Sequence, residues 1–193
     1  MTHQEIMAIL EETGAYLKGH FRLTSGRHSD RYFEKFKVLQ HPKYAERLCA
    51  ELARRFSDVE VDVVIGPAVG AIIIAYEVAR HLQARAIFAE REDGKMRLRR
   101  GFEIEPGERV LIVEDVITTG GSVREVIELV ESTEGSIQGV GLLMDRSGGT
   151  INLGYRLEAL VASEIVSYMP DDCPLCEEGV PITQRGSRNL WVV

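Results

Sequence analysis

The 193-residue chain lacks the features that mark membrane, secreted and nucleic-acid-binding proteins. It has no apolar run near the roughly 18 residues that a membrane-spanning helix requires. Its three cysteines are too few for a disulfide framework, and its polar, acidic N-terminus is unlike a secretory signal. Lysine and arginine number 23 against 30 acidic residues, and the net charge of −7 argues against a nucleic-acid partner. These absences favour a cytoplasmic enzyme with no membrane partner.

Two common nucleotide-binding motifs are also absent. No Gly-Lys-Ser/Thr follows a glycine-rich turn, as a Walker A loop requires, and there is no G-x-G-x-x-G fingerprint. Hydrophobic residues, in contrast, make up 45% of the chain, which is ample for the core of a single domain over residues 1–193. Small anionic substrates remain compatible with this composition, because local basic residues can hold them.

Hydrophobic periodicity predicts helices that alternate with buried strands, as in an open α/β sheet. The expected helices are residues 6–14, 42–56, 72–82 and a helix that begins near 122; the expected strands are residues 61–65, 86–89, 110–113, 137–144 and 157–162.

The stretch RVLIVEDVITTGGSVR, residues 109–124, combines a buried strand with a polar turn and a helix. Ligands bind such sheets where a strand passes into a helix, and free amides at a helix start suit phosphate. Glu114 and Asp115 would repel phosphate, unless they accept hydrogen bonds from a sugar diol or help to hold a metal that carries phosphate. The alternative is an ordinary turn with two exposed acids.

This order of strand, acid pair, hydroxyl-glycine turn and helix closely resembles the phosphoribosyl-pyrophosphate (PRPP) motif of type I phosphoribosyltransferases. The resemblance implies a Rossmann-like parallel sheet flanked by helices, with a small hood formed by residues 1–40 and about 165–193. It also implies that one continuous stretch of the chain binds PRPP: Glu114, Asp115, Val116, Ile117, Thr118, Thr119, Gly120, Gly121 and Ser122.

A second unusual stretch, residues 19–33, contains turn formers, basic side chains and an aromatic pair. It suits either a loop over a flat anionic ligand or a turn between two edge strands. Its F-x-L-x-S-G-x-x-S pattern, followed by Tyr-Phe, is similar to the N-terminal segment of orotate phosphoribosyltransferases, many of which have lysine at Thr24. That resemblance implies transfer of phosphoribose from PRPP to orotate, with Mg²⁺ bound through PRPP and not directly by the protein.

The turn at residues 66–71 follows another expected strand and contains Gly66, Pro67 and Gly70. It is either a structural turn or one whose backbone amides face a pyrophosphate, as the corresponding loop does in the superfamily. Many orotate enzymes have lysine where this chain has Gly70. We therefore expect any pyrophosphate contact there to come from the backbone.

Five of the 23 basic residues fall in residues 90–101, around an Asp-Gly pair that predicts a hairpin. The hairpin is either a solvated charged edge or a mobile source of positive charge for a departing pyrophosphate. In the family, a loop at this place closes over the active site of the partner subunit of a homodimer. Its pattern matches Arg91 and Lys95 as PRPP contacts, and makes Lys95, with Asp115, the catalytic candidate. Glu92 and Arg97 replace a lysine and a histidine of the family pattern.

Arg146 follows the expected strand 137–144, at the ligand edge of the sheet. Its guanidinium can hold a carboxylate with two hydrogen bonds, or it can pair with Asp145 at the surface. The resemblance implies that Arg146, together with Thr118, binds orotate.

Cys173 and Cys176 form one C-x-x-C pair near the C-terminus. A zinc site needs four ligands, no second C-x-x-C exists, and Cys49 lies in an expected core helix. A redox pair would follow a strand and open a helix, which the surrounding acids and prolines do not suggest. An inert turn is favoured over metal or redox chemistry, although a site completed across a dimer stays possible.

Two rival functions share parts of this pattern. A purine phosphoribosyltransferase would have the central motif without the segment at residues 19–33. A non-catalytic regulator that senses PRPP could dispense with Lys95 and Arg146, and would need an appended basic module to bind nucleic acid.

Overall fold

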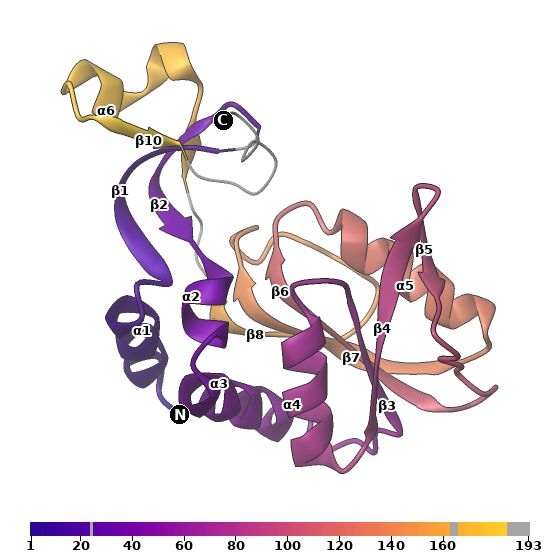
Figure 1. Ribbon diagram of the computed structural model, residues 1–193. Coiled ribbons are helices and arrows are strands. Elements are labelled where there is room, and N and C mark those ends of the chain that lie inside the picture. The colour runs from indigo at the N-terminus through magenta and orange to yellow at the C-terminus, as the bar shows by residue number, and fades with distance from the viewer. Residues whose placement is uncertain (24, 163–165, 185–193) are drawn as a thin grey trace.

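The computed structural model describes residues 1–23, 25–162 and 166–184 (Figure 1). Its main body is a six-stranded sheet in the order β5-β4-β3-β6-β7-β8, in which every pair is parallel except β4 with β5. The strands are β3 (Val63–Pro67), β4 (Arg85–Glu92), β5 (Lys95–Leu98), β6 (Arg109–Ile117), β7 (Ser136–Asp145) and β8 (Leu157–Ala162). The predicted fold class, a parallel sheet flanked by helices, is confirmed.

Helices bury both faces of this sheet (Figure 1). Leu111 and Val113 of β6 belong to a core shared with α1 (His3–Glu12), α2 (Lys35–Leu39), α3 (Pro42–Arg54) and α4 (Ile72–Leu82). Val110 and Ile112 belong to the opposite core, which α5 (Gly121–Ser132) covers. Alternate side chains of a strand point to opposite faces, so a strand covered on both sides must be apolar throughout.

β6 continues four residues beyond its apolar run, which the sequence pattern did not predict. Val116 and Ile117 still pair with Met144 and Asp145 of β7. Glu114 and Asp115 therefore lie inside the strand and not after it, because the neighbouring strand provides hydrogen-bond partners that hydrophobic patterning alone does not reveal.

The hood is a second, four-stranded sheet that stands above the main body in Figure 1. Its order is β10-β1-β2-β9, so the two ends of the chain contribute to it jointly. The strands are β1 (Tyr16–Arg22), β2 (His28–Phe33), β9 (Ser167–Tyr168) and β10 (Ile182–Gln184), with a 3-10 turn (Pro170–Asp172) and α6 (Pro174–Glu177) between the last two. A small hood built from both ends of the chain is present, but α1 and α2, which fall in the predicted range 1–40, pack in the core of the main sheet. Residues 19–33 contribute to the hood strands β1 and β2. Thr24 and residues 163–165 and 185–193 lie outside the described part of the chain.

α6 corrects one expectation about the tail. Cys173 caps this one-turn helix and Pro174 is its first residue. The acids and prolines around the cysteine pair therefore do not prevent a helix, because proline is well tolerated in a first helical turn.

Candidate active site

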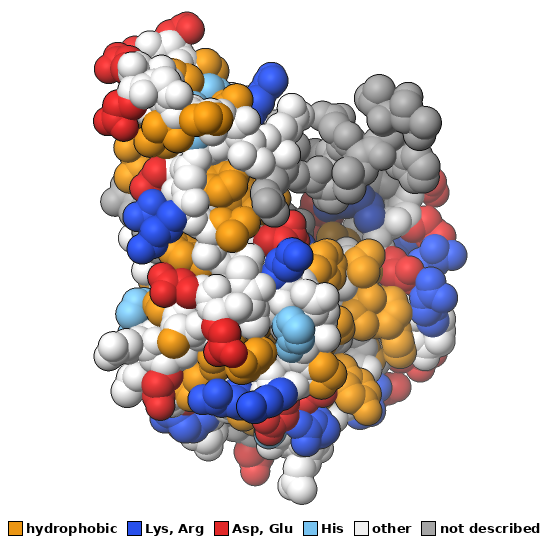
Figure 2. Space-filling model, turned by 60° about the vertical axis from the view of Figure 1, so that its left-hand side comes forward, with side chains coloured by type: hydrophobic (Ala, Val, Ile, Leu, Met, Phe, Trp, Pro, Cys, Tyr) orange, Lys and Arg blue, Asp and Glu red, His pale blue; other side chains and the backbone are white. Residues whose placement is uncertain are grey.

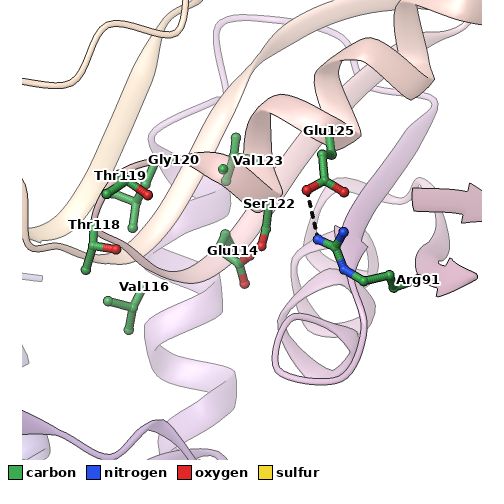
Figure 3. Close-up of a pocket in the computed structure, with 11 residues that line it drawn as sticks. Arg91, Glu114, Val116, Thr118, Thr119, Gly120, Ser122, Val123 and Glu125 are labelled. Carbon is green, nitrogen blue, oxygen red and sulfur yellow. Dashed lines mark hydrogen bonds and ion pairs between the residues drawn. The ribbon is translucent and has the colours of Figure 1, made fainter. Parts of the chain in front are cut away.

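A pocket of ≈ 280 Å³ opens where β6 passes into α5 (Figure 3). Every residue predicted from the central motif lines it except Asp115, and Arg91 joins from β4. The lining residues are Arg91, Glu114, Val116, Ile117, Thr118, Thr119, Gly120, Gly121, Ser122, Val123 and Glu125. One strand end, one turn and one helix start thus bring the predicted residues together.

Gly120 shapes the turn that closes this pocket. Its φ is +82°, in the left-handed region that favours glycine, and an added Cβ would lie 2.5 Å from Ile151 Cδ1. The turn leads directly into α5, whose first amides have no acceptor within the helix. Amides in this position, flanked by the hydroxyls of Thr118, Thr119 and Ser122, can bind a phosphate group.

Glu114 and Asp115 are both buried, and Glu114 is the one that lines the pocket. Burial, and next to it the charge of Asp115, raises the pKa of Glu114 to about 8. Burial also raises the pKa of Asp115, although the ammonium of Lys35 opposes the rise. The ligand-free site therefore favours a proton on the pair, and it would favour hydrogen-bond donors or positive charge in the ligand.

Lys35 is a site residue that the sequence pattern did not reveal. Its Nζ lies 2.5 Å from Asp115 Oδ2, where it neutralises a carboxylate that is only 6% exposed. Residues so distant in the sequence meet because α2 (Figure 1) packs in the core on the face of β6 that contains Leu111 and Val113. Only its position soon after the Tyr32-Phe33 pair could have pointed to it.

Gly70 joins the same cluster from the turn between β3 and α4. A Cβ at Gly70 would lie 1.7 Å from Asp115 Oδ2 and 2.7 Å from Lys35 Nζ, so a larger residue would displace this ion pair. The turn at residues 66–71 therefore lies directly against the acidic pair. This placement is compatible with the pyrophosphate alternative, and it explains why a glycine stands here.

Arg91 reaches the pocket from β4 and pairs there with a residue of α5. Its guanidinium donates to Glu125 Oε1 at 2.8 Å and to the Gly94 carbonyl at 2.7 Å, and Figure 3 shows it pointing across the pocket toward Glu125. Lys95 does not line the pocket; it is exposed at the start of β5, in the predicted hairpin. Within one chain, the structure brings Arg91 to the turn between β6 and α5, residues 118–122, which we call the phosphate turn after its predicted role. Lys95 lies outside the pocket.

Arg146 lies at the end of β7, next to the phosphate turn. Its backbone amide donates to the Ile117 carbonyl at 2.9 Å, and its Nε is buried without a hydrogen-bond partner in the described part of the chain. Burial lowers the pKa of this guanidinium, opposed by the charges of Tyr32 and Tyr16 in the hood. The predicted alternative, a pair with Asp145, is absent among the described residues, since that carboxylate accepts from the amides of Ser147 and Gly149.

The parallel sheet flanked by helices, together with the turn between β6 and α5, is typical of a phosphoribosyl-transferring α/β domain. The family model "Phosphoribosyl transferase domain" matches residues 37–156, which contain every residue that lines the pocket. The fold alone does not separate base specificities, because an adenine phosphoribosyltransferase from Saccharomyces cerevisiae has a similar structure, with a TM-score of 0.63 at 19% identity over 80% of this chain and 99% of that one.

Full-length comparisons are more specific. An orotate phosphoribosyltransferase from Pelotomaculum thermopropionicum is 62% identical over 190 residues, covering 98% of this chain and 100% of its own. The crystal structure of orotate phosphoribosyltransferase from Aeropyrum pernix has a TM-score of 0.63 at 29% identity, over 81% of this chain and 93% of that one. The chain belongs to the orotate phosphoribosyltransferase family. In the described residues, no helix has the length and apolar character needed to cross a membrane.

Proposed function

We propose that this protein transfers the 5-phosphoribosyl group of PRPP to orotate, giving orotidine 5′-phosphate and pyrophosphate in pyrimidine synthesis. Family membership supports the reaction, and Arg146 is the observation that carries the choice of base. Its buried, unpartnered Nε lies beside the phosphate turn, where the carboxylate of orotate would give it a charged partner. A purine has no carboxylate to satisfy this arginine.

The turn between β6 and α5 holds the 5-phosphate in this proposal, through amides and hydroxyls of residues 118–122. Glu114 and Asp115 accept hydrogen bonds from the ribose hydroxyls. As the anomeric C–O bond breaks, positive charge develops on the ribose ring and negative charge on the leaving pyrophosphate. Buried carboxylates near the ring stabilise the first charge, so the acidic pair favours the transition state over the ground state.

Mg²⁺ suits the chemistry of this site, because carboxylate and hydroxyl oxygens surround the pocket. Asp115 already has Lys35 as its partner, whereas Glu114 and Glu125 line the pocket that a metal carried in by PRPP would enter. Bound with PRPP, the ion would supply positive charge against the leaving pyrophosphate. We propose that the ion is held through PRPP, with no direct protein ligand.

Positive charge on the far side of the pocket comes from the β4–β5 hairpin. Arg91 already lines the pocket of its own chain, and Lys95 lies outside it. We propose a homodimer in which the hairpin of one subunit brings Lys95 to the site of the other. Exposed apolar side chains on and before α4 support a dimer: Val69 is 70%, Ile73 39% and Tyr76 63% exposed.

Substitution of Arg146 tests the choice of base. Arg146→Ala should raise the KM for orotate while the KM for PRPP changes little, because only the base loses its contact. Losing a charge-assisted bidentate contact costs on the order of 2–3 kcal/mol, or roughly 30- to 150-fold in KM. Steady-state kinetics with each substrate varied in turn would measure both constants.

Arg54→Ala is the control, since this exposed arginine of α3 pairs only with Glu51 among the described residues. It should leave both constants unchanged. A loss of PRPP affinity with orotate unaffected would contradict the assignment of Arg146. Turnover with adenine or hypoxanthine in place of orotate would favour the purine alternative, and absence of any turnover would favour the regulator.

A further inference from the structure

The hood contains a cluster of metal-ligating side chains that lies apart from the substrate pocket. Among the described residues, His20 of β1, His28 of β2, Cys173 and Cys176 bring their ligand atoms within 4.8 Å of one another. His20, His28 and Cys173 are buried, whereas Cys176 is exposed. α6, which contains Cys176, lies at the end of the hood away from the main sheet (Figure 1). None of these four residues takes part in the reaction proposed above.

The spacing within this cluster matches a tetrahedral metal site. With zinc bonds of about 2.0–2.1 Å to nitrogen and about 2.3 Å to sulfur, ligand atoms lie roughly 3.3–3.8 Å apart. His20 Nε2 lies 3.1 Å from His28 Nδ1, and 3.5 and 3.8 Å from the sulfur atoms of Cys173 and Cys176. Cys176 Sγ lies 3.3 Å from His28 Nδ1. Little movement would be needed to seat an ion among them.

The hydrogen bonding of His20 is also that of a metal ligand. Its Nδ1 lies 2.8 Å from the Val180 carbonyl oxygen, which can only accept. Nδ1 must therefore carry the proton, and Nε2 presents its lone pair to the cluster. A ligating histidine is commonly fixed in this way by a backbone carbonyl on its other nitrogen.

The C-terminal part of the hood needs such a link, because it has almost no core. Cys173 is the one buried residue in the described stretch 166–184. β9 has two residues, β10 has three, and α6 is a single turn of four. Segments this small cannot be held by apolar packing, and natural proteins join them with a disulfide or a metal.

We propose that His20, His28, Cys173 and Cys176 bind one structural Zn²⁺ that joins the C-terminal segment to the β1–β2 hairpin. Two thiolates and two imidazoles suit zinc, whereas Mg²⁺ prefers oxygen ligands. Four protein ligands leave no open position for a substrate, which separates this site from a catalytic metal. Acidic side chains at the outer end of the hood, visible in Figure 2, add negative charge around it; they include Asp171, Asp172, Glu177 and Glu178.

The proposed zinc has a consequence for the substrate side of the hood. β1 and β2 also carry Tyr16 and Tyr32, which interact electrostatically with Arg146. An ion that fixes the hairpin therefore also fixes the tyrosines above the base site. This consequence rests on the proposed function, but the metal site itself does not.

Metal analysis of the purified full-length protein tests the site without reference to activity. Prepared without chelators, the wild type should contain close to one zinc per chain by inductively coupled plasma mass spectrometry. Cys176→Ser and His28→Ala should lose most of the zinc, whereas His28→Cys should keep it, because a thiolate can replace the imidazole. Cys49→Ser is the matched control, since that thiol is buried in α3, outside the cluster.

A second set of measurements uses the wild type, so the proposal can still be tested if a variant fails to fold. Zinc-free wild type should bind Co²⁺ with the absorption of a tetrahedral thiolate complex, and limited proteolysis should cut residues 166–184 faster before the metal is added than after. A wild type that contains no zinc and takes up no Co²⁺ would overturn the proposal. So would equal zinc in Cys176→Ser and the wild type, or a Cys173–Cys176 disulfide in the zinc-free protein as purified. Each of these results is independent of orotate turnover.

Discussion

The acidic pair shows how single residues acquire properties that their neighbours impose. Glu114 and Asp115 are adjacent on a strand, so their side chains point to opposite faces. Glu114 lines the pocket, whereas Asp115 pairs with Lys35. Burial raises the pKa of both acids, but the ammonium of Lys35 opposes the rise at Asp115, whereas Glu114, which accepts a hydrogen bond only from the Asp115 amide in the described part of the chain, has its pKa raised to about 8. A ligand that brings hydroxyls or positive charge would complete the site.

The raised pKa of Glu114 predicts how the free energy of unfolding depends on pH. Unfolded, Glu114 releases its proton near its ordinary pKa of 4.5; folded, it keeps the proton to about 8. Between these values the folded state binds more protons, so this group lowers the free energy of unfolding as pH rises. Glu114→Gln removes the effect and should become progressively more stable than the wild type from pH 5 to pH 8, by at most about 1.4 kcal/mol per pH unit.

Urea denaturation at pH 5, 6, 7 and 8 would measure the difference, with the exposed Glu128→Gln of α5 as the control. The control should show no pH-dependent difference from the wild type. If the Glu114→Gln advantage stayed constant with pH, the raised pKa would be wrong. Catalysis should fall in Glu114→Gln even where stability rises, because a carboxyl can ionise as positive charge develops on the ribose and an amide cannot.

At the scale of elements, the β4–β5 hairpin is the part most suited to movement. Its strands pair in register from Ala89–Leu98 to Glu92–Lys95, and its basic side chains find acidic partners on the surface, among them Arg100 with Glu90 and Arg99 with Glu92. Exposed ion pairs of this kind contribute little to stability, typically about 0–1 kcal/mol. Pyrophosphate could therefore replace these acids as the partner at small cost.

The hairpin prediction concerns Lys95 and the subunit that it serves. Lys95→Ala should lower kcat sharply with a smaller effect on substrate binding, because its charge matters most as pyrophosphate departs. Mixing Lys95→Ala chains with Asp115→Asn chains tests the arrangement. If the hairpin acts on the partner, each mixed dimer has one intact site, and random mixing should return roughly a quarter of wild-type activity.

Activity of the remixed sample, with mixed dimers confirmed by native mass spectrometry, gives the answer. If each hairpin served its own subunit, every site would keep one defect and no activity would return. That result would refute the shared arrangement and leave the orotate assignment unaffected.

At the scale of the whole molecule, the two sheets differ in how much apolar packing stabilises them. The main sheet is buried on both faces by the helices of two apolar cores, whereas the outer strands of the hood have little apolar cover. Arg146 of the main body lies near enough to Tyr32 of the hood for the tyrosine to influence the pKa of its guanidinium. The turn at residues 118–122 therefore belongs to the part of the molecule that is packed on both faces, whereas the hood is supported separately.

The exposed apolar side chains around α4 give a prediction for the assembly. Tyr76→Glu should weaken the dimer, because it places a charge in a surface that two subunits would bury. It should lower activity in proportion to the loss of dimer if Lys95 acts on the partner. Analytical ultracentrifugation and activity at several protein concentrations would show both effects. Ser132→Glu is the control, because Ser132 is exposed at the end of α5, on the face of the main sheet opposite to α4, and it should change neither dimer formation nor activity. A fully dimeric Tyr76→Glu would place the interface elsewhere.

The sequence by itself determined the main sheet, the turn between β6 and α5 and the family; that this turn binds phosphate remains a prediction. Local requirements of this kind can be recognised in the sequence. They include an apolar run that is buried on both faces and a glycine that must adopt a left-handed conformation. The bounds of α4 and β8 were predicted as the structure has them, residues 72–82 and 157–162. The roles of Lys95 and of Arg146 in substrate binding remain predictions.

Only the tertiary structure decided which distant residues meet. Lys35 reaches Asp115 across 80 positions of sequence, and the histidines of the hood lie about 150 residues from the cysteines that they face. The cysteine pair looked incomplete, because a search for a second C-x-x-C cannot find ligands supplied by β1 and β2. Such contacts depend on how separate elements pack, and no spacing along the chain encodes them.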